Sequence, residues 1–478
     1  SRTIEAGLWV TIVGYHRELT QSYRSYAKNH AAAKITALLP LVTLRTFNHL
    51  AKQIKWHGFR YEPVDMAHWK RLHQLYKFSE TEGFQRQELK LYAQDDIPTS
   101  CADQYLQVLM LDTLNLGNLA VKQIEMVDRW LDSWSHTLVL RPDLDEQHDA
   151  FYVNLEEGHG AKRVRRVKQE AHLRFWSTEA LVSLLDQIMG ELREGEESIR
   201  ARLGDDCRLP ACLEFIEDIK RVWTVGGVKR QQRVHERKPV VKSIDVIAAF
   251  QDICAQIGHD LEYLAAQRGE GDAKPKLSYE EMVDIRLYGF VTRETMVKVE
   301  RKRAAENRAA VTEQWTTDNE SEGGCGAVIP PGKSTWLRIG RLVGLRSATH
   351  PRYMLGVIRR LSKTAANESN VGIEFIATRP INVTLRSRGG EHRFTVEGME
   401  PVNVKAAHSA VYITGEPGQG AAENTLVVES LAYAKGREYD LLSRGKCYVI
   451  SLGDVAEKGI DWLRINFRVL RKLEEPYY

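Results

Sequence analysis

Apolar residues in the first half of the chain recur at a spacing of three and four, which is the period of an amphipathic helix. Such stripes occupy residues 42–59, 67–84, 101–119 and 178–195. We expect the apolar faces of these helices to pack against one another in a core. A looser segment between about 140 and 174 predicts a short strand at Phe151–Leu155 and a turn at Gly158–Gly160.

The second half of the chain changes period. Apolar and polar residues alternate there in short runs separated by glycine-rich turns, which is typical of antiparallel strands with one buried face. These runs lie at 337–343, 353–357, 371–375, 381–385 and 463–469. The β-rich region begins near residue 313 and is longer than one small barrel needs, so we expect two β domains.

A helical stretch interrupts the start of this β region. Pro239–Ile247 predicts a strand, but Ala248–Leu264 has helical spacing and Gly269–Pro275 reads as a loop. Ser278–Glu281 then fits a capping box and predicts a basic helix that continues to about Asn307.

Together these patterns predict a multidomain α+β protein. We expect an N-terminal all-α domain at 1–226, then a β domain at 227–378 that is split by a helical insertion at about 250–308. A second, C-terminal β domain follows at 379–478.

The composition is that of a soluble globular protein, with 43% hydrophobic and 27% charged residues. The net charge of +3 argues against a dedicated nucleic-acid-binding protein. Basic runs at 162–168 and 301–308 keep an RNA-associated role as a third alternative. No apolar run reaches the roughly 18 residues that a membrane span needs.

Six scattered cysteines form no C-x-x-C pair, so we expect reduced thiols in a cytoplasmic protein. None of the 15 histidines pairs with a carboxylate or cysteine at the spacing of metal ligands. No G-x-S-x-G motif appears, and Gly415–Gly420 departs from G-x-G-x-x-G. We therefore predict no metal site and no enzymatic activity.

One segment imitates a phosphate-binding P-loop. Gly332–Thr335 reads Gly-Lys-Ser-Thr, but the first glycine of the motif is replaced by Ala327. Pro330 and Pro331 remove amide donors from the place where a phosphate would bind. Trp336–Ile339 reads as a strand, although a P-loop is followed by a helix. We expect a polar hairpin loop here.

The segment just before it has a different pattern, Asn319-x-Ser321-x-x-Gly324. It is accompanied by Trp315 and by the runs Ile339–Val343, Leu355–Arg360 and Val371–Phe375. In this order, over about 313–378, they resemble the PilZ domains, a family of cyclic di-GMP receptors. The resemblance implies a PilZ-like antiparallel β-barrel in which Asn319, Ser321 and Gly324 bind the ligand. Asn and Ser side chains can pair with guanine edges or phosphate, and glycine lets the backbone approach closely.

PilZ domains also carry an R-x-x-x-R segment ahead of the first strand, where the planar fork of arginine can take O6 and N7 of guanine together. Arg233 and Arg237 match this spacing, with Arg230 close by. The long segment between Arg237 and Asn319 departs from the family and is explained by the insertion. A second candidate arm contains Arg303 and Arg308, whose spacing is one residue off. In a third alternative the site is degenerate and only the fold survives.

The resemblance therefore implies a cytoplasmic receptor for cyclic di-GMP. We expect ligand binding to order the arginine arm against the barrel and to change the domain arrangement that an unidentified protein partner recognises. The second β domain would serve partner binding or self-association as a homo-oligomer. The alternative is a degenerate PilZ-like scaffold that binds protein partners without nucleotide.

Overall fold

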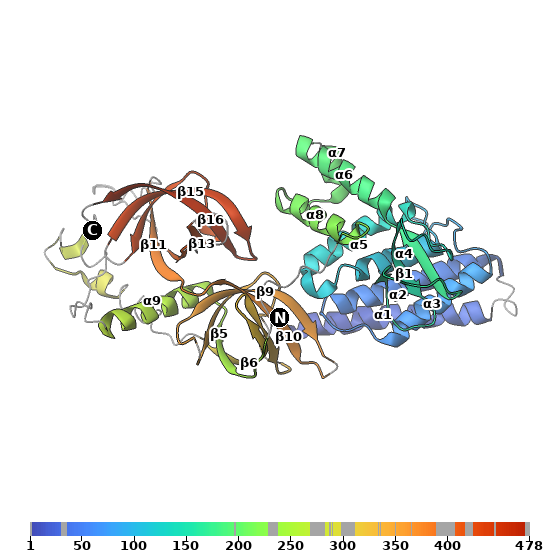
Figure 1. Ribbon diagram of the computed structural model, residues 1–478, viewed down its shortest axis with the longest axis horizontal. Helices are drawn as coiled ribbons and strands as arrows, with labels where there is room; N and C mark the ends of the chain where they lie inside the picture. Colours follow the sequence, from blue (N-terminus) through green and yellow to red (C-terminus); the bar gives the residue numbers. More distant parts are fainter. Residues whose placement is uncertain are drawn as a thin grey trace. The chain divides into compact units, whose positions relative to one another are not determined.

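Figure 1 shows the fold as a computed structural model. The structure describes residues 2–29, 36–195, 197–227, 238–267, 283–285, 288, 290–297, 311–332, 334, 336–348, 350–364, 366–388, 407–415, 424–443 and 446–473. Contacts divide the chain into two compact units, Ser1–Val234 with Leu361–Asn367 and His235–Arg360 with Glu368–Tyr478. The domain boundaries at 226/227 and 378/379 stay predictions.

The N-terminal unit is built mainly of helices, as the apolar stripes predict. They are α1 (Arg2–Lys28), α2 (Leu39–Gly58), α3 (Met66–Thr81), α4 (Cys101–Asp112), α5 (Val121–Trp134), α6 (Glu179–Glu194), α7 (Glu197–Leu203) and α8 (Ala211–Trp223), with short 3-10 turns at Thr36–Leu38, Leu116–Asn118 and Ser135–Thr137. The helix expected at 101–119 ends early, at Asp112, and Asn115 adopts a left-handed conformation with φ 53°.

Helix α4 lies at the centre of this unit's core, because every residue from Cys101 to Leu111 is buried. A capping box fixes its first turn. The Asp103 amide donates to Ser100 Oγ at 3.2 Å, and the Ser100 amide donates to Asp103 Oδ2 at 3.0 Å. Such caps contribute about 1 kcal/mol by satisfying amides that the helix leaves unpaired.

A small antiparallel sheet belongs to the same unit. It contains β1 (Asp149–Asn154), β2 (Lys162–Arg163) and β3 (Leu173–Ser177) in the order β2-β1-β3. The strand predicted at 151–155 is confirmed as β1. Phe151 and Trp176 stack with ring centroids 5.9 Å apart and bury this face of the sheet.

The expectation of six reduced cysteines is wrong for two of them. Cys207 and Cys212 form a disulfide, with Cα atoms 5.0 Å apart. Backbone bonds from Cys207 to Gly204 and from Cys212 to Arg208 turn the chain back on itself. A local turn therefore brings the two cysteines of this disulfide together, although they do not have C-x-x-C spacing.

The second unit contains two barrels, in line with the expected fold class. The strands of the first are β4 (Lys238–Pro239), β5 (Ser243–Ile247), β6 (Glu313–Ser321), β7 (Gly324–Ile329), β8 (Leu342–Ser347), β9 (Met354–Lys363) and β10 (Ser369–Ala377). Their order is β4-β6-β5-β8-β9-β10-β7, and pairing of β6 with β7 closes the ring. The strand expected at Pro239–Ile247 is thus present as β4 and β5.

The second barrel is a closed antiparallel ring with the order β11-β12-β13-β16-β15-β14. Its strands are β11 (Ile381–Ser387), β12 (Ala407–Ile413), β13 (Thr425–Glu429), β14 (Glu438–Ser443), β15 (Lys446–Lys458) and β16 (Trp462–Leu473). Alternate residues along β16, among them Leu463 and Ile465, are buried in the interior.

Helix α9 (Phe250–Gln267) joins the two barrels into one core (Figure 1). Its Ile253 and Ile257 pack in a cluster that also contains Leu355 from the first barrel and Val427 and Trp462 from the second. The predicted helix at 248–264 is therefore confirmed. Its apolar face is buried between the two barrels, which stabilises the helix at this position.

Two expectations for this unit have other outcomes. The strand expected at Leu337–Ile339 is wrong, because these residues form a loop between β7 and β8. Gly332 and Gly340 begin and end this loop with φ of 78° and 81°, which breaks strand geometry. Most of the basic helix expected up to Asn307 lies outside the described residues.

In the described part of the chain, no helix combines the length and apolar composition needed to cross a bilayer.

Two histidines are buried between α1 and α2. Their Nδ1 atoms lie 2.9 Å apart, so one ring donates a hydrogen bond that the other accepts. His16 is 8% exposed and His49 is 2% exposed. Burial, and then nearby positive charges, lower the pKa of both side chains from 6.5 to about 4. Folding therefore favours the neutral rings.

We expect acid to destabilise the N-terminal unit through this pair. The unfolded state takes up protons below pH 6.5 and the folded state only near pH 4, so stability is lost as the pH falls between these values. Scanning calorimetry should show a midpoint several degrees lower at pH 5 than at pH 7.

The loss should be smaller in His16→Gln. His148 is exposed, and its hydrogen bond to Glu179 raises its pKa, so its protonation favours the folded state at low pH. His148→Gln therefore serves as a control of opposite sign, and it should lose at least as much stability as the wild type at low pH. An equal loss in His16→Gln and the wild type contradicts the role of the pair.

Candidate functional site

The Asn319-x-Ser321-x-x-Gly324 motif forms the hairpin between β6 and β7. Ser321 faces Gly324 across the turn, and its Oγ donates to the Gly324 carbonyl oxygen at 3.2 Å. A register shift between Thr317 and Asn319 leaves Asp318 as the extra residue of a bulge. Asn319 and Ser321 are two residues apart on one strand, so they lie on the same face. The structure thus brings the three predicted motif residues together.

Glycines allow other chain segments to approach this hairpin. A Cβ atom on Gly324 would collide with the backbone carbonyl oxygen of Ile373 in β10. A Cβ atom on Gly326 would collide with the side chains of Asp318 and Asn319. Glycine at these positions therefore lets β10 pair closely with β7 and leaves room for the Asn319 carboxamide.

The Asn319 side chain is only half satisfied. Its Nδ2 donates to Asp318 Oδ1 at 2.6 Å. Its Oδ1 is buried, and no donor among the described residues reaches it. An unpaired buried acceptor costs about 1–3 kcal/mol, so a donor that reaches this oxygen stabilises the site.

The strand that follows the predicted arginine arm pairs directly with the motif. In the ladder between β4 and β6, Pro239 is opposite Asn319 and Lys238 is opposite Glu320. Lys238 is the residue next to Arg237 in the chain. Lys242 extends the contact, because its Nζ lies 2.5 Å from Glu320 Oε2.

The predicted arginines themselves are not placed. Arg230, Arg233 and Arg237 lie outside the described residues, and so do Arg303 and Arg308 of the alternative arm. Their role as ligands stays a prediction. The first described residue after Arg237 is Lys238, which pairs with the motif strand. The first described residue after Arg308 is Val311, two residues before β6 begins.

The charge of the hairpin limits what it can bind alone. Asp318, Glu320 and Glu322 place three carboxylates within the turn region, and Lys242 offsets that of Glu320. An anion such as a phosphodiester would be repelled by the Asp318 carboxylate, which pairs with the neutral carboxamide of Asn319. A phosphate ligand therefore requires further cations from another segment.

The Gly332–Thr335 segment has a structural role at its described residues. Ser334 is 5% exposed and hydrogen-bonds to the Glu313 carboxylate. The Trp336 indole donates to Glu313 Oε1 at 2.8 Å and stacks on Trp315 at 5.5 Å between centroids. Trp315 is 2% exposed, so its expected place in the barrel core is confirmed. A strand, β8, follows this loop, which excludes a P-loop.

An ion-pair network links the first barrel to the second. Glu374, which is opposite Gly324 in the β7–β10 ladder, lies 2.6 Å from Arg359 Nε. Arg359 also pairs with Glu457 of β15. Burial opposes ionisation of Arg359, but the two carboxylates outweigh it and raise its pKa. Two residues, Glu374 and Arg359, therefore connect Gly324 of the motif with Glu457 of the second barrel.

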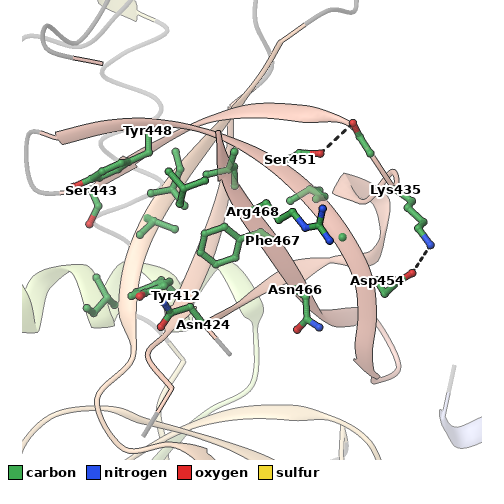
Figure 2. Close-up of a pocket in the computed structure, with 18 of the residues that line it drawn as sticks. Tyr412, Asn424, Lys435, Ser443, Tyr448, Ser451, Asp454, Asn466, Phe467 and Arg468 are labelled. Carbon is green, nitrogen blue, oxygen red and sulfur yellow. Dashed lines mark hydrogen bonds and ion pairs between the residues drawn. The ribbon is translucent and has the colours of Figure 1, made fainter. Parts of the chain in front are cut away.

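The second barrel contains a cavity that the sequence did not indicate (Figure 2). Its volume is about 1160 Å³, and three of its lining side chains are the aromatic rings of Tyr412, Tyr448 and Phe467. Tyr412 and Phe467 meet edge to face with centroids 6.1 Å apart. Burial raises the pKa of Tyr412. In the sequence, these aromatic residues of β12, β15 and β16 do not distinguish a filled core from a cavity.

Among the residues that the structure describes, no three His, Cys, Asp or Glu side chains are grouped to hold a metal ion.

Comparison with known proteins adds one finding. Residues 1–143 match the family model described as "Cyclic-di-GMP receptor FimW, N-terminal domain". The match covers less than a third of the chain and ends before both barrels. No curated protein and no solved structure matched the chain. The relationship to a cyclic di-GMP receptor thus comes from the helical region, whereas the resemblance to PilZ domains comes from other residues and is not tested by the match.

We expect Gly324→Ala to disrupt the hairpin. The new methyl group must push Ile373 away, which separates β7 from β10 at a cost of about 1–3 kcal/mol. Chemical denaturation should show a less stable barrel unit.

Gly372→Ala, on the partner strand, is the matched control. Its Cβ would meet the Arg360 Cβ at 3.2 Å, a contact that a shift of a few tenths of an ångström relieves. Equal stability losses in the two variants contradict the close approach at Gly324.

Proposed function

We propose that this protein is a receptor for cyclic di-GMP, with a PilZ-like site at the β6–β7 hairpin and an arm containing Arg233 and Arg237. Support for the ligand comes from residues 1–143, which match a cyclic di-GMP receptor domain. Support for the place of the site comes from the Asn319 motif. Two independent regions of the chain therefore favour the same ligand.

The pairing of β4 with β6 favours the arm that contains Arg233 and Arg237. Pro239 and Lys238 lie opposite Asn319 and Glu320, so the chain that leaves the arm enters the barrel at the motif. Arg237 directly precedes Lys238 in the chain. The chain that follows Arg308 instead enters β6 at Glu313, at the opposite end of this strand from the hairpin.

The chemistry of the two parts is complementary. The arm supplies guanidinium groups that bind phosphate and the O6 and N7 acceptors of guanine. The hairpin supplies the Oδ1 of Asn319, an acceptor for guanine N1–H and N2–H or for an arginine of the arm. The acidic hairpin repels the phosphate groups of the ligand unless the guanidinium groups of the arm are close. A bound ligand therefore contacts both the arm and the hairpin and holds them together.

This arrangement couples binding to a local rearrangement. Asn319 Oδ1 is covered as well as unpaired, so a donor reaches it only after the side chain or a neighbour moves. Movement at Gly324 acts on Glu374, which Arg359 connects to Glu457 of the second barrel. A protein partner that prefers the ligand-bound arrangement would receive the signal.

Calorimetric titration of cyclic di-GMP tests the proposal, with cyclic di-AMP as the control ligand. We expect micromolar or tighter, guanine-specific binding. Arg233→Ala/Arg237→Ala should weaken it by at least about 100-fold, because charge-assisted bonds to phosphate are lost. Arg303→Ala/Arg308→Ala should have little effect. The reverse order would move the arm to Arg303 and Arg308.

Asn319→Ala should weaken binding by about tenfold, the cost of one acceptor. Asn370→Ala is the matched control, because Asn370 is opposite Val328 at the other end of the β7–β10 ladder. Full-affinity binding by Asn319→Ala removes the hairpin from the site.

The scaffold alternative rests on the acidic hairpin. If the arm does not reach the hairpin, the Asp318 carboxylate disfavours a phosphodiester there. No binding of cyclic di-GMP by the wild type would favour this alternative and direct the search to protein partners.

A further inference from the structure

The cavity in the second barrel has walls suited to an apolar molecule. Its lining includes aliphatic side chains from several strands: Ile381, Val383, Leu441, Ile450, Leu452 and Val469. Tyr412, Tyr448 and Phe467 are only partly buried, so their rings remain accessible from the cavity. Its volume of about 1160 Å³ exceeds the range of roughly 300–1000 Å³ that is usual for small-molecule sites.

The charged side chains that line the cavity are mostly positive. They are Lys435, Lys446 and Arg468, with Asp454 as the single carboxylate. Lys435 pairs with Asp454, as Figure 2 shows, and these two charges offset each other. Among the described residues, no carboxylate forms an ion pair with Lys446 or Arg468. The lining therefore has excess positive charge beside apolar walls.

We propose that this cavity binds an anionic amphiphile, a molecule with an alkyl or acyl chain and one carboxylate or phosphate group. The chain lies against Phe467 and the aliphatic wall, where burial of each CH₂ contributes favourably. The anionic group pairs with Lys446 or Arg468. These two cations lie apart on the barrel, since Lys446 begins β15 and Arg468 is opposite Ser451. The proposal is independent of cyclic di-GMP binding.

Titration of the full chain with dodecanoate and with dodecyl phosphate, both below micelle formation, tests the proposal. We expect saturable binding with one molecule per chain, and the stronger of the two probes identifies the head group. Dodecyltrimethylammonium has the same tail and the opposite charge, so it should bind at least about tenfold more weakly, equivalent to about 1.4 kcal/mol.

Two neighbouring positions in β16 provide matched variants. Val469 lines the cavity and is 56% exposed, whereas Leu470 is 50% exposed and is not part of the lining. Val469→Trp should occupy part of the cavity and weaken dodecanoate binding at least about tenfold, but Leu470→Trp should bind as the wild type. Both positions are exposed, and circular dichroism confirms that each variant is folded.

Charge reversal locates the anionic group. Lys446→Glu or Arg468→Glu should weaken binding, whereas Lys472→Glu, an exposed residue outside the lining, should not. Absence of saturable binding overturns the proposal. So does equal binding of the cationic probe, equal binding by Val469→Trp and Leu470→Trp, or full affinity in both Lys446→Glu and Arg468→Glu.

Discussion

Everything at the motif depends on the pairing of β4 and β5 with β6 across the long intervening segment. Closing such a loop has an entropic cost that rises only slowly with its length. Burial of Ile244, Val246 and Trp315 in the first barrel offsets it. The same pairing fixes the chain after Arg237 beside Asn319. Residues 238–239 and 319–320 are therefore far apart in sequence but paired in space.

The charges at the β6–β7 hairpin determine which groups can bind there. The Asp318 carboxylate makes the hairpin a poor anion site alone, whereas Lys242 offsets the charge of Glu320. The buried Asn319 Oδ1, which has no donor among the described residues, and its acidic surroundings both favour donors with positive charge. Such donors are abundant in the segment that ends at Arg237. Arg359 pairs with Glu374, beside the hairpin, and with Glu457 of the second barrel.

Local patterns predicted much of this fold. Period-two alternation and turn residues at Asn319 and Gly324 indicated the β regions and the hairpin, since these signals depend on neighbours in sequence. Other features depend on tertiary contacts. The Leu337–Ile339 segment alternates like a strand, but a hydrogen bond to Glu313 holds the neighbouring Trp336 in a loop. The disulfide and the barrel cavity also arise only after folding, and α1 has exposed apolar residues such as Val10 that obscure its helical stripe.

The central claim is that one ligand joins the arm to the hairpin. Amide hydrogen exchange, measured by mass spectrometry with and without cyclic di-GMP, tests it most directly. We predict that the ligand slows exchange together in peptides covering 228–242 and 316–326, while peptides covering 300–310 exchange at unchanged rates. Protection confined to 300–310, or to either segment alone, would contradict the account.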